Sequence, residues 1–277
     1  MSLIDRFRVE PGKTAGLSKR DPAETAGVDH AEADDRLAAN VEAIDALQQR
    51  LYAEHTRALL VVLQAMDAAG KDSTIRHVFG PLNPQGVQVK AFKKPTPDEL
   101  AHDFLWRVHQ ATPRRGHIAI FNRSHYEDVL VVRVDKLVPE SVWRDRYDQI
   151  NGFERLLCEA GTKVVKIHLL ISPERQREKL MRRITDPRRN WKFEAEDFET
   201  RKKWGAYREA YEEAITRTST KHAPWYVVPT DKKWFRLLVV SEIIRAELEA
   251  MKPEFPALKI EPAAAMKLLE ELNESSP

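Results

Sequence analysis

The sequence predicts an α/β protein in which a parallel sheet of about five strands is sandwiched by helices. Short apolar, β-branched runs alternate with longer segments of helical periodicity, and this alternation is typical of a parallel sheet with crossover helices. The 277 residues are enough to bury one large core without disulfides. The predicted strands cover residues 59–63, 87–92, 118–121, 164–171 and 226–228.

Helical segments are expected before, between and after these strands. Leu37, Ile44 and Leu51 recur at helical spacing ahead of the first strand. Further helices are expected over residues 97–110, 139–160, 193–216 and 234–251. The chain therefore divides into an extended N-terminal arm with several Gly and Pro residues (1–35), a main α/β domain (36–252) and a C-terminal tail helix (253–277).

Composition limits the classes of function. With 45 basic and 43 acidic side chains the net charge is only +2, so we expect no nucleic-acid partner, and any polyanion site must come from local clustering. Cys158 is the only cysteine, which excludes an intrachain disulfide and suits a reducing cytoplasm. No run of 18 apolar residues and no signal-peptide pattern is present, so we expect a cytoplasmic protein without a membrane contact.

The most informative segment follows the first predicted strand and is close to the P-loop pattern G-x-x-x-x-G-K-[ST]. Gly70 and Lys71 match, whereas Ala65 replaces the first glycine and Asp72 replaces the Ser or Thr. A strand that ends in small residues before a helix aims main-chain N–H groups at an anion, and Lys71 adds a positive charge. An ordinary strand-to-helix turn, with Asp72 as an early-helix acid, is the alternative. The phosphate-binding candidates of this loop are Ala68, Ala69, Gly70, Lys71, Asp72 and Ser73.

Acidic residues in a phosphate loop indicate a metal ion. A carboxylate beside phosphate is repulsive unless a cation lies between them, and the hard oxygen ligands of Asp67 and Asp72 suit Mg²⁺, with Mn²⁺ as a substitute. The strand 118–121 ends at Asn122, where P-loop enzymes usually place an Asp in the magnesium shell. Asp67 and Asn122 are therefore the metal candidates, Asn122 through a bound water.

The residues after Asn122 supply a further candidate. Arg123 stands at a strand end beside the phosphate loop, where a guanidinium can clamp a transferring phosphate. Ser124 and Glu127 have the spacing of a helix capping box, which is a structural alternative for both. His125 is better explained by packing than by catalysis. The catalytic candidates are Asp67, Lys71 and Arg123.

A basic segment follows the fourth predicted strand. From residue 175 to residue 192 it carries eight basic and two acidic side chains, and Asp186-Pro187 breaks it into two helices. We interpret residues 175–217 as a mobile lid that closes over the reacting phosphates and expels water. A solvated helical face and a nucleic-acid patch are the alternatives. The phosphate-binding candidates of the lid are Arg182, Arg183, Arg188, Arg189 and Lys192.

Lys93 and Lys94, after the second strand, form a smaller basic spot. They are candidates for holding acceptor phosphate or a long anionic donor, although surface lysines are common.

Together these segments resemble the family-2 polyphosphate kinases. The resemblance rests on residues 66–74, 121–127, 183–192 and 225–233 and covers roughly residues 36–251. It implies a P-loop kinase fold with a helical lid and Mg²⁺-dependent, direct in-line transfer between inorganic polyphosphate and an adenine or guanine nucleotide. It also implies that Asp67 and Lys71 serve Mg²⁺ and phosphate, that Arg123 serves the transferring group, and that the protein is a homo-oligomer, either a dimer or a tetramer.

The acceptor is indicated by a smaller set of residues. Asp72, Asn122 and Glu127 together are similar to the subgroup that accepts both AMP and ADP, and Asn122, Tyr126 and Glu127 are the nucleotide-binding candidates. Two other functions remain open from the residues alone. One is an ATP-dependent nucleoside monophosphate kinase, and the other is a non-catalytic sensor of nucleotides or polyanions.

Overall fold

The structure, a computed structural model, describes residues 2–274. Its centre is a six-stranded sheet in the order β1-β6-β5-β2-β4-β3, in which all strands except β1 run parallel. The expectation of a parallel sheet sandwiched by helices is confirmed. The strands are β1 (Arg8–Val9), β2 (Ala58–Ala65), β3 (Val87–Ala91), β4 (Ile118–Asn122), β5 (Thr162–Leu170) and β6 (Trp225–Pro229).

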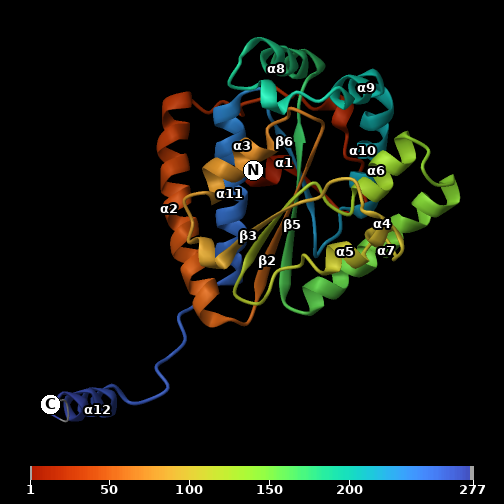
Figure 1. Ribbon diagram of the computed structural model, residues 1–277. Helices are drawn as coiled ribbons and strands as arrows, with labels where there is room; N and C mark the ends of the chain where they lie inside the picture. The colour runs from red at the N-terminus through yellow and green to blue at the C-terminus, as the bar shows by residue number, and fades with distance from the viewer. Residues whose placement is uncertain (1, 275–277) are drawn as a thin grey trace.

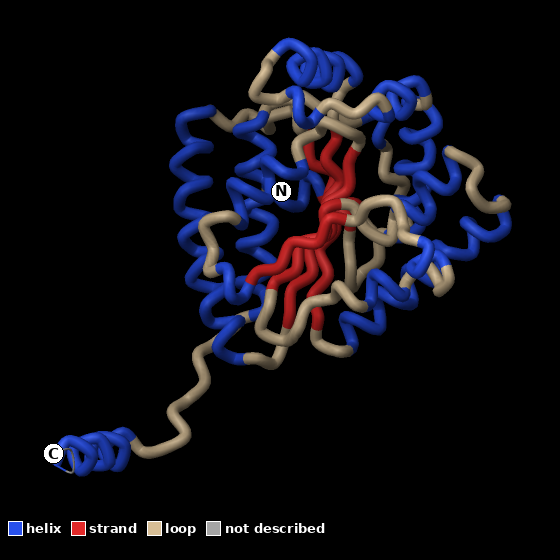
Figure 2. Tube along the Cα trace, in the orientation of Figure 1, coloured by secondary structure: helices blue, strands red, loops and turns tan. Residues whose placement is uncertain are grey.

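Helices cover both faces of the sheet (Figure 1). On one face α2 (His30–Glu54) packs against α11 (Lys233–Met251), and the other face carries α6 (Glu127–Val134), α7 (Glu140–Glu159) and α10 (Trp204–Thr218). Every residue of β2 is buried between these layers, which explains its continuous apolar run. Figure 2 shows the strands at the centre of the molecule with helices on both sides. Because β2 is buried there, the position at which its following loop begins is fixed.

The remaining helices lie at the ends of this core. The short α3 (Lys71–Thr74) follows β2 and continues as a π-helix over Ile75–Phe79. Beyond the carboxyl ends of the strands lie α8 (Pro173–Thr185) and α9 (Glu196–Lys202), and α12 (Pro262–Glu274) stands away from the body on an extended link (Figure 1). No helix within residues 2–274 is long and apolar enough to cross a membrane.

The N-terminal segment is not the extended arm that its composition predicted. It forms α1 (Leu3–Phe7), and β1 adds an antiparallel edge strand to β6. Phe7 and Val9 are buried, and the Phe7 ring packs edge-on against Phe235. These contacts join segments that are far apart in the sequence. The local Gly and Pro content carries no information about such contacts, so it predicted an extended arm.

Two predicted helices are interrupted. Residues 97–110 form α4 (Pro97–Leu100) and α5 (Trp106–His109), because the Asp103 side chain accepts a hydrogen bond from the main chain of Leu105 and closes a turn between them. The helix predicted over 193–216 is divided into α9 and α10 at Lys203.

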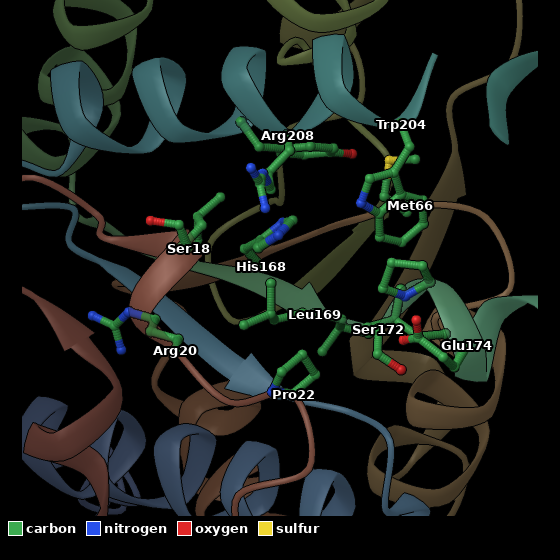
Figure 3. Close-up of a pocket in the computed structure, with 15 residues that line it drawn as sticks. Ser18, Arg20, Pro22, Met66, His168, Leu169, Ser172, Glu174, Trp204 and Arg208 are labelled. Carbon is green, nitrogen blue, oxygen red and sulfur yellow. The ribbon is translucent and has the colours of Figure 1, made fainter. Parts of the chain in front are cut away.

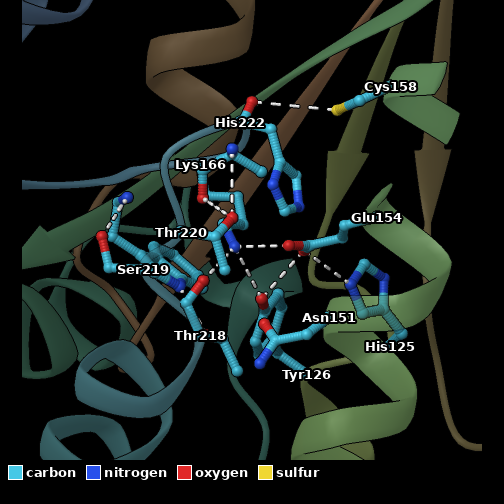
Figure 4. Close-up of polar contacts among 12 residues, drawn as sticks. His125, Tyr126, Asn151, Glu154, Cys158, Lys166, Thr218, Ser219, Thr220 and His222 are labelled. Atoms are coloured by element: carbon cyan, nitrogen blue, oxygen red, sulfur yellow. Dashed lines mark hydrogen bonds and ion pairs between the residues drawn. The ribbon is translucent and has the colours of Figure 1, made fainter. Parts of the chain in front are cut away.

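A buried ion pair connects the sheet to three other segments (Figure 4). Lys166 on β5 donates to Glu154 on α7 at 2.5 Å, to the main-chain oxygen of Thr218 at 2.6 Å and to the hydroxyl of Tyr126 at 3.0 Å. Tyr126 in turn donates to Glu154 at 2.8 Å. All these side chains are fully buried. Buried charges are costly unless hydrogen bonds satisfy their polar atoms, and here the Lys166 and Glu154 side chains both have such partners. The network holds the turn that follows β4.

Lys166→Met should destabilise the protein by about 3–5 kcal/mol, because it leaves the Glu154 carboxylate buried without its cation. Lys163→Met on the same strand is the matched control, since Lys163 pairs with Glu247 at 2.9 Å and is 31% exposed. We expect the control to cost less than about 1 kcal/mol. The free energy of unfolding in urea measures both, and equal losses would contradict the importance of the buried pair.

Candidate active site

The carboxyl ends of β2 and β4 lie side by side and bring the predicted site residues together. The two strands are parallel, with Leu63 opposite Asn122, and the main-chain N–H of Arg123 donates to the Leu63 oxygen at 3.1 Å. Asn122 and Arg123 therefore stand next to the loop that leaves β2.

The loop after β2 bends tightly before α3. Ala68 and Gly70 have φ angles of +62° and +115°, and Gly70 precedes the first residue of the helix. The ammonium group of Lys71 folds back and donates to the main-chain oxygen of Ala65 at 3.0 Å. The side-chain hydroxyl of Thr74 donates to the Gly70 oxygen at 3.1 Å and closes the first helical turn. This is the geometry of a loop that wraps around an anion at a helix start.

A cluster of alternating charges lies beside this loop. Arg123 has a φ of +62° and donates to the Asp67 carboxylate at 2.7 Å. Burial opposes the charge of Arg123, but Glu127 and Asp67 outweigh it and raise the pKa of the guanidinium above its usual value. Arg123 is therefore a permanent cation.

Lys71 and Glu127 belong to the same cluster and are both half-buried. Burial lowers the pKa of Lys71, while the charge of Asp67 opposes that effect. Burial also raises the pKa of Glu127. A phosphate beside Lys71 would compensate the ammonium charge that burial makes costly.

Asp72 connects the loop to β4 and to the basic segment. Its carboxylate accepts from the Asn122 amide at 2.9 Å and from the Lys192 ammonium at 3.1 Å. Burial alone would raise the pKa of Asp72, but these two hydrogen bonds keep it below its usual value. Among the five phosphate-binding candidates of the lid, Lys192 is therefore the one that contacts the loop.

The other basic candidates have different partners. Arg183 pairs with Asp197 on α9, while Arg188 and Arg189 pair with Asp186 and are largely exposed. Arg182 is also exposed. Lys93 and Lys94 are exposed on the loop after β3, where the Lys93 main-chain oxygen accepts from Arg107 at 2.9 Å. Within residues 2–274 these six side chains make no hydrogen bond to the phosphate loop.

The structure corrects the expectation that Tyr126 binds nucleotide. Tyr126 is fully buried, and its hydroxyl is engaged by Glu154 and Lys166 (Figure 4). The capping-box alternative is also wrong, because the Ser124 hydroxyl accepts from the main chain of Tyr126 and not from Glu127. Glu127 remains available to the charged cluster around Arg123.

Three loop contacts were missed by sequence reasoning. Gln176 donates to the Asp67 main-chain oxygen at 3.0 Å, and Lys179 donates to that of Ala69 at 3.5 Å. The buried Arg236 donates to the same Ala69 oxygen at 3.0 Å. Lys179 belongs to a visible basic run, whereas Arg236 lies 167 residues after Ala69 in an apolar helix and gave no signal.

A cavity of about 270 Å³ opens on the β5 side of the loop (Figure 3). Its lining is largely apolar and includes Met66 from the loop, His168 from β5 and Trp204 from α10. The Nδ1 atom of His168 has no hydrogen-bond partner among the described residues, and burial lowers the pKa of this imidazole to about 3. His168 is thus neutral and adds no charge to this side of the loop.

The oxygen atoms at the site fit a hard divalent cation. Asp67, Asp72 and Asn122 supply carboxylate and amide oxygens at the loop. Within residues 2–274 no group of three or more His, Cys, Asp or Glu side chains converges to form a complete cage. Mg²⁺ commonly takes only one or two carboxylates and completes its shell with water and substrate phosphates, so the donor set suits it.

Known proteins are similar to this chain in sequence. Residues 27–256 match the family described as Polyphosphate kinase 2 (PPK2). The chain is 49% identical to the AMP/ADP-polyphosphate phosphotransferase of Meiothermus ruber, over 91% of this chain and 96% of that protein. It is 44% identical to the ADP-polyphosphate phosphotransferase of Rhodopseudomonas palustris, over 84% of each.

A solved structure is similar along nearly the whole chain. The crystal structure of Polyphosphate Kinase 2 from Arthrobacter aurescens TC1 superposes with a TM-score of 0.93 at 39% identity. The match covers 98% of this chain and 97% of that one, and the fold is a P-loop kinase fold.

Gly70→Ala should distort the phosphate loop and destabilise the protein by about 1–2 kcal/mol, because the φ of +115° strains any side chain. A Cβ at this position would also collide with the guanidinium of Arg236. Gly152→Ala is the matched control, since no atom lies near its added Cβ within α7, and it should stabilise by about 0.5–1 kcal/mol. Thermal unfolding measures both, and a neutral Gly70→Ala would contradict the described loop.

Proposed function

The chain belongs to the polyphosphate kinase 2 family, and we propose that it moves the terminal phosphate of inorganic polyphosphate to both AMP and ADP, and in reverse. The proposal is carried by one observation, the grouping of Lys71, Asp67 and Arg123 at the carboxyl end of β2. Phosphoryl transfer needs positioning and charge neutralisation more than covalent chemistry, and these residues offer both.

The donor's terminal phosphate would lie on the main-chain N–H groups of residues 68–73. Lys71 would leave its contact with the Ala65 oxygen and bind a phosphate oxygen instead. Arg123, held by Asp67, would bind a second oxygen of the same group, which fixes its orientation for attack.

The reaction is a direct displacement. A terminal phosphate oxygen of AMP or ADP attacks the terminal phosphorus of polyphosphate and forms a new P–O bond. The P–O bond to the next phosphate unit breaks, and its electron pair leaves with the shortened polyphosphate. Lys71 and Arg123 offset the charge on the transferring group without forming a bond to it.

Asp67 and Asn122 are the residues that would hold a magnesium ion, Asn122 through water, with Mn²⁺ as a substitute. When bound, the ion would supply positive charge that offsets the negative charge of the substrate phosphates. Because Asp67 also orients Arg123, its carboxylate would serve two cations at once.

The acceptor is proposed to enter from the β3 and β4 side of the loop. Asn122 and Glu127 are the nucleotide-binding candidates there, and Lys93 and Lys94 are candidates for its phosphates. The combination of Asp72, Asn122 and Glu127 supports acceptance of AMP as well as ADP. Guanine nucleotides, a cytoplasmic location and a dimer or tetramer remain predictions.

The lid is proposed to close when the donor binds. Lys192 already contacts Asp72, and Gln176 and Lys179 contact main-chain oxygens of the loop, so residues 175–217 are attached to it at several points. Closure would bring Arg182, Arg183, Arg188 and Arg189 toward the polyphosphate, where Arg188 and Arg189 would exchange the Asp186 carboxylate for phosphate.

Nucleotide production by the purified full-length protein tests the proposal. With Mg²⁺ and polyphosphate, we expect ADP and then ATP to form from AMP, and ATP to form from ADP. Product from ADP alone would contradict the dual acceptor, and product only with ATP as donor would indicate a nucleoside monophosphate kinase.

Lys71→Ala is the informative variant in the same assay. We expect kcat to fall by at least about 100-fold, as expected when one preorganised charge is lost from a transition state. Lys13→Ala, an exposed lysine far from the loop in sequence, is the control and should keep full activity. Binding of nucleotide without any turnover by the unaltered protein would instead favour a sensor.

A further inference from the structure

Arg107 is a buried cation that the proposed reaction does not use. It lies on α5, its side chain is 7% exposed, and its guanidinium carbon lies 5.5 Å from the centre of the Phe92 ring. Its Nη1 atom donates to the main-chain oxygen of Lys93 at 2.9 Å. The same guanidinium lies 3.5 Å from the carboxylate of Glu99 on α4 and 3.9 Å from that of Asp128 on α6. One side chain therefore connects three segments of the fold.

The first of these segments leaves β3 beside the active site. The main-chain N–H of Phe92 donates to the Asn122 oxygen at 3.0 Å, so residues 92–96, which we call the acceptor loop, begin next to the end of β4. Lys93 and Lys94 follow directly, and both side chains are exposed. In the described part of the chain neither ammonium group has a hydrogen bond or an ion pair. Both are therefore available to an anion.

The other end of the acceptor loop is also held near Arg107. The Glu99 carboxylate accepts from the main-chain N–H of Thr96 at 2.9 Å, and the Thr96 hydroxyl accepts from the main chain of Glu99 at 3.2 Å, which caps the start of α4. Arg107 thus holds the loop directly at Lys93 and through Glu99 at Thr96. A guanidinium suits this place, because its planar fork offers several donors at once.

Asp128 attaches this arrangement to the helix that begins at Glu127. The Oδ2 atom of Asp128 has no hydrogen-bond partner among residues 2–274, and Arg107 is the cation that lies 3.9 Å from it. Arg146 on α7 approaches from the other side and donates to the Asp128 main-chain oxygen at 2.9 Å and to Oδ1 at 3.3 Å. The position of the acceptor loop relative to Glu127 is therefore set through one carboxylate between two arginines.

We propose that Arg107 is a positioning residue for the acceptor nucleotide, because it holds Lys93 and Lys94 in place relative to Glu127. This inference rests on the proposed location of the acceptor. Arg107 itself does not touch the nucleotide, since its side chain is buried and engaged by the protein. The two exposed ammonium groups bind the acceptor's phosphates, and their contribution depends on a main chain that is held from beneath.

Arg107→Lys tests this role without removing the charge that faces Asp128. A single ammonium group cannot reach the Lys93 oxygen, Glu99 and Asp128 together. We expect KM for both AMP and ADP to rise about tenfold, equivalent to about 1.4 kcal/mol. We expect kcat and KM for polyphosphate to stay within about twofold of the unaltered enzyme, because the phosphate loop is unchanged. Initial rates with Mg²⁺, each at a saturating level of the other substrate, measure these constants.

Arg146→Lys is the matched control. Arg146 contacts the same carboxylate from α7, but among the described residues it makes no hydrogen bond or ion pair with the acceptor loop. It should lower the urea midpoint of unfolding about as much as Arg107→Lys does, yet leave KM for the nucleotides unchanged. An unchanged nucleotide KM in Arg107→Lys, an equal rise in Arg146→Lys, or an equal rise in KM for polyphosphate would overturn the inference.

A binding measurement separates this inference from the proposed reaction. By calorimetry, the Kd of ADP without polyphosphate should be about tenfold higher in Arg107→Lys than in the unaltered protein and unchanged in Arg146→Lys. If the unaltered protein bound ADP but transferred no phosphate, the proposed function would fail, while these dissociation constants would still decide the role of Arg107. Equal affinity of all three proteins, or no binding of ADP by the unaltered protein, would overturn the inference.

Discussion

The rest of the site depends on the positive charge that is concentrated at one loop. Lys71, Arg123, Lys179 and Arg236 all contact or border the loop after β2. The carboxylates of Asp67, Glu127 and Asp72 offset part of that charge, and main-chain oxygens take much of the remaining hydrogen bonding. Such an arrangement favours a ligand that brings many negative charges.

The scaffold holds these charged side chains in place beside the loop. β2 is buried along its whole length, so the start of the loop is fixed. Gly70 leaves the space that the Arg236 guanidinium fills, and α11 thereby determines how close a cation comes to the loop. On the other side, the buried Lys166–Glu154 pair anchors the turn at Tyr126 and so restrains Arg123 and Glu127 at its two ends. Electrostatic preorganisation of this kind needs rigid support.

Local patterns were sufficient for the features that are local in sequence. The β-branched runs predicted the parallel strands, and the loop motif with the following strand end located Lys71 and Arg123 correctly beside each other. Contacts that depend on tertiary packing were not predictable in this way. β1 pairs across more than 200 residues, Arg236 reaches the loop from a distant helix, and Tyr126 turned out to be buried because Lys166 and Glu154 meet it in the core.

A crystal structure with AMP and a non-hydrolysable, methylene-bridged polyphosphate analogue tests most directly where the donor binds. We expect the terminal phosphate on the main chain of residues 68–73, with Lys71 and Arg123 both within hydrogen-bond distance of it. The Lys71 contact with the Ala65 oxygen should then be broken. A terminal phosphate found away from this loop, or one that leaves Lys71 on Ala65, would contradict the assignment of the active site.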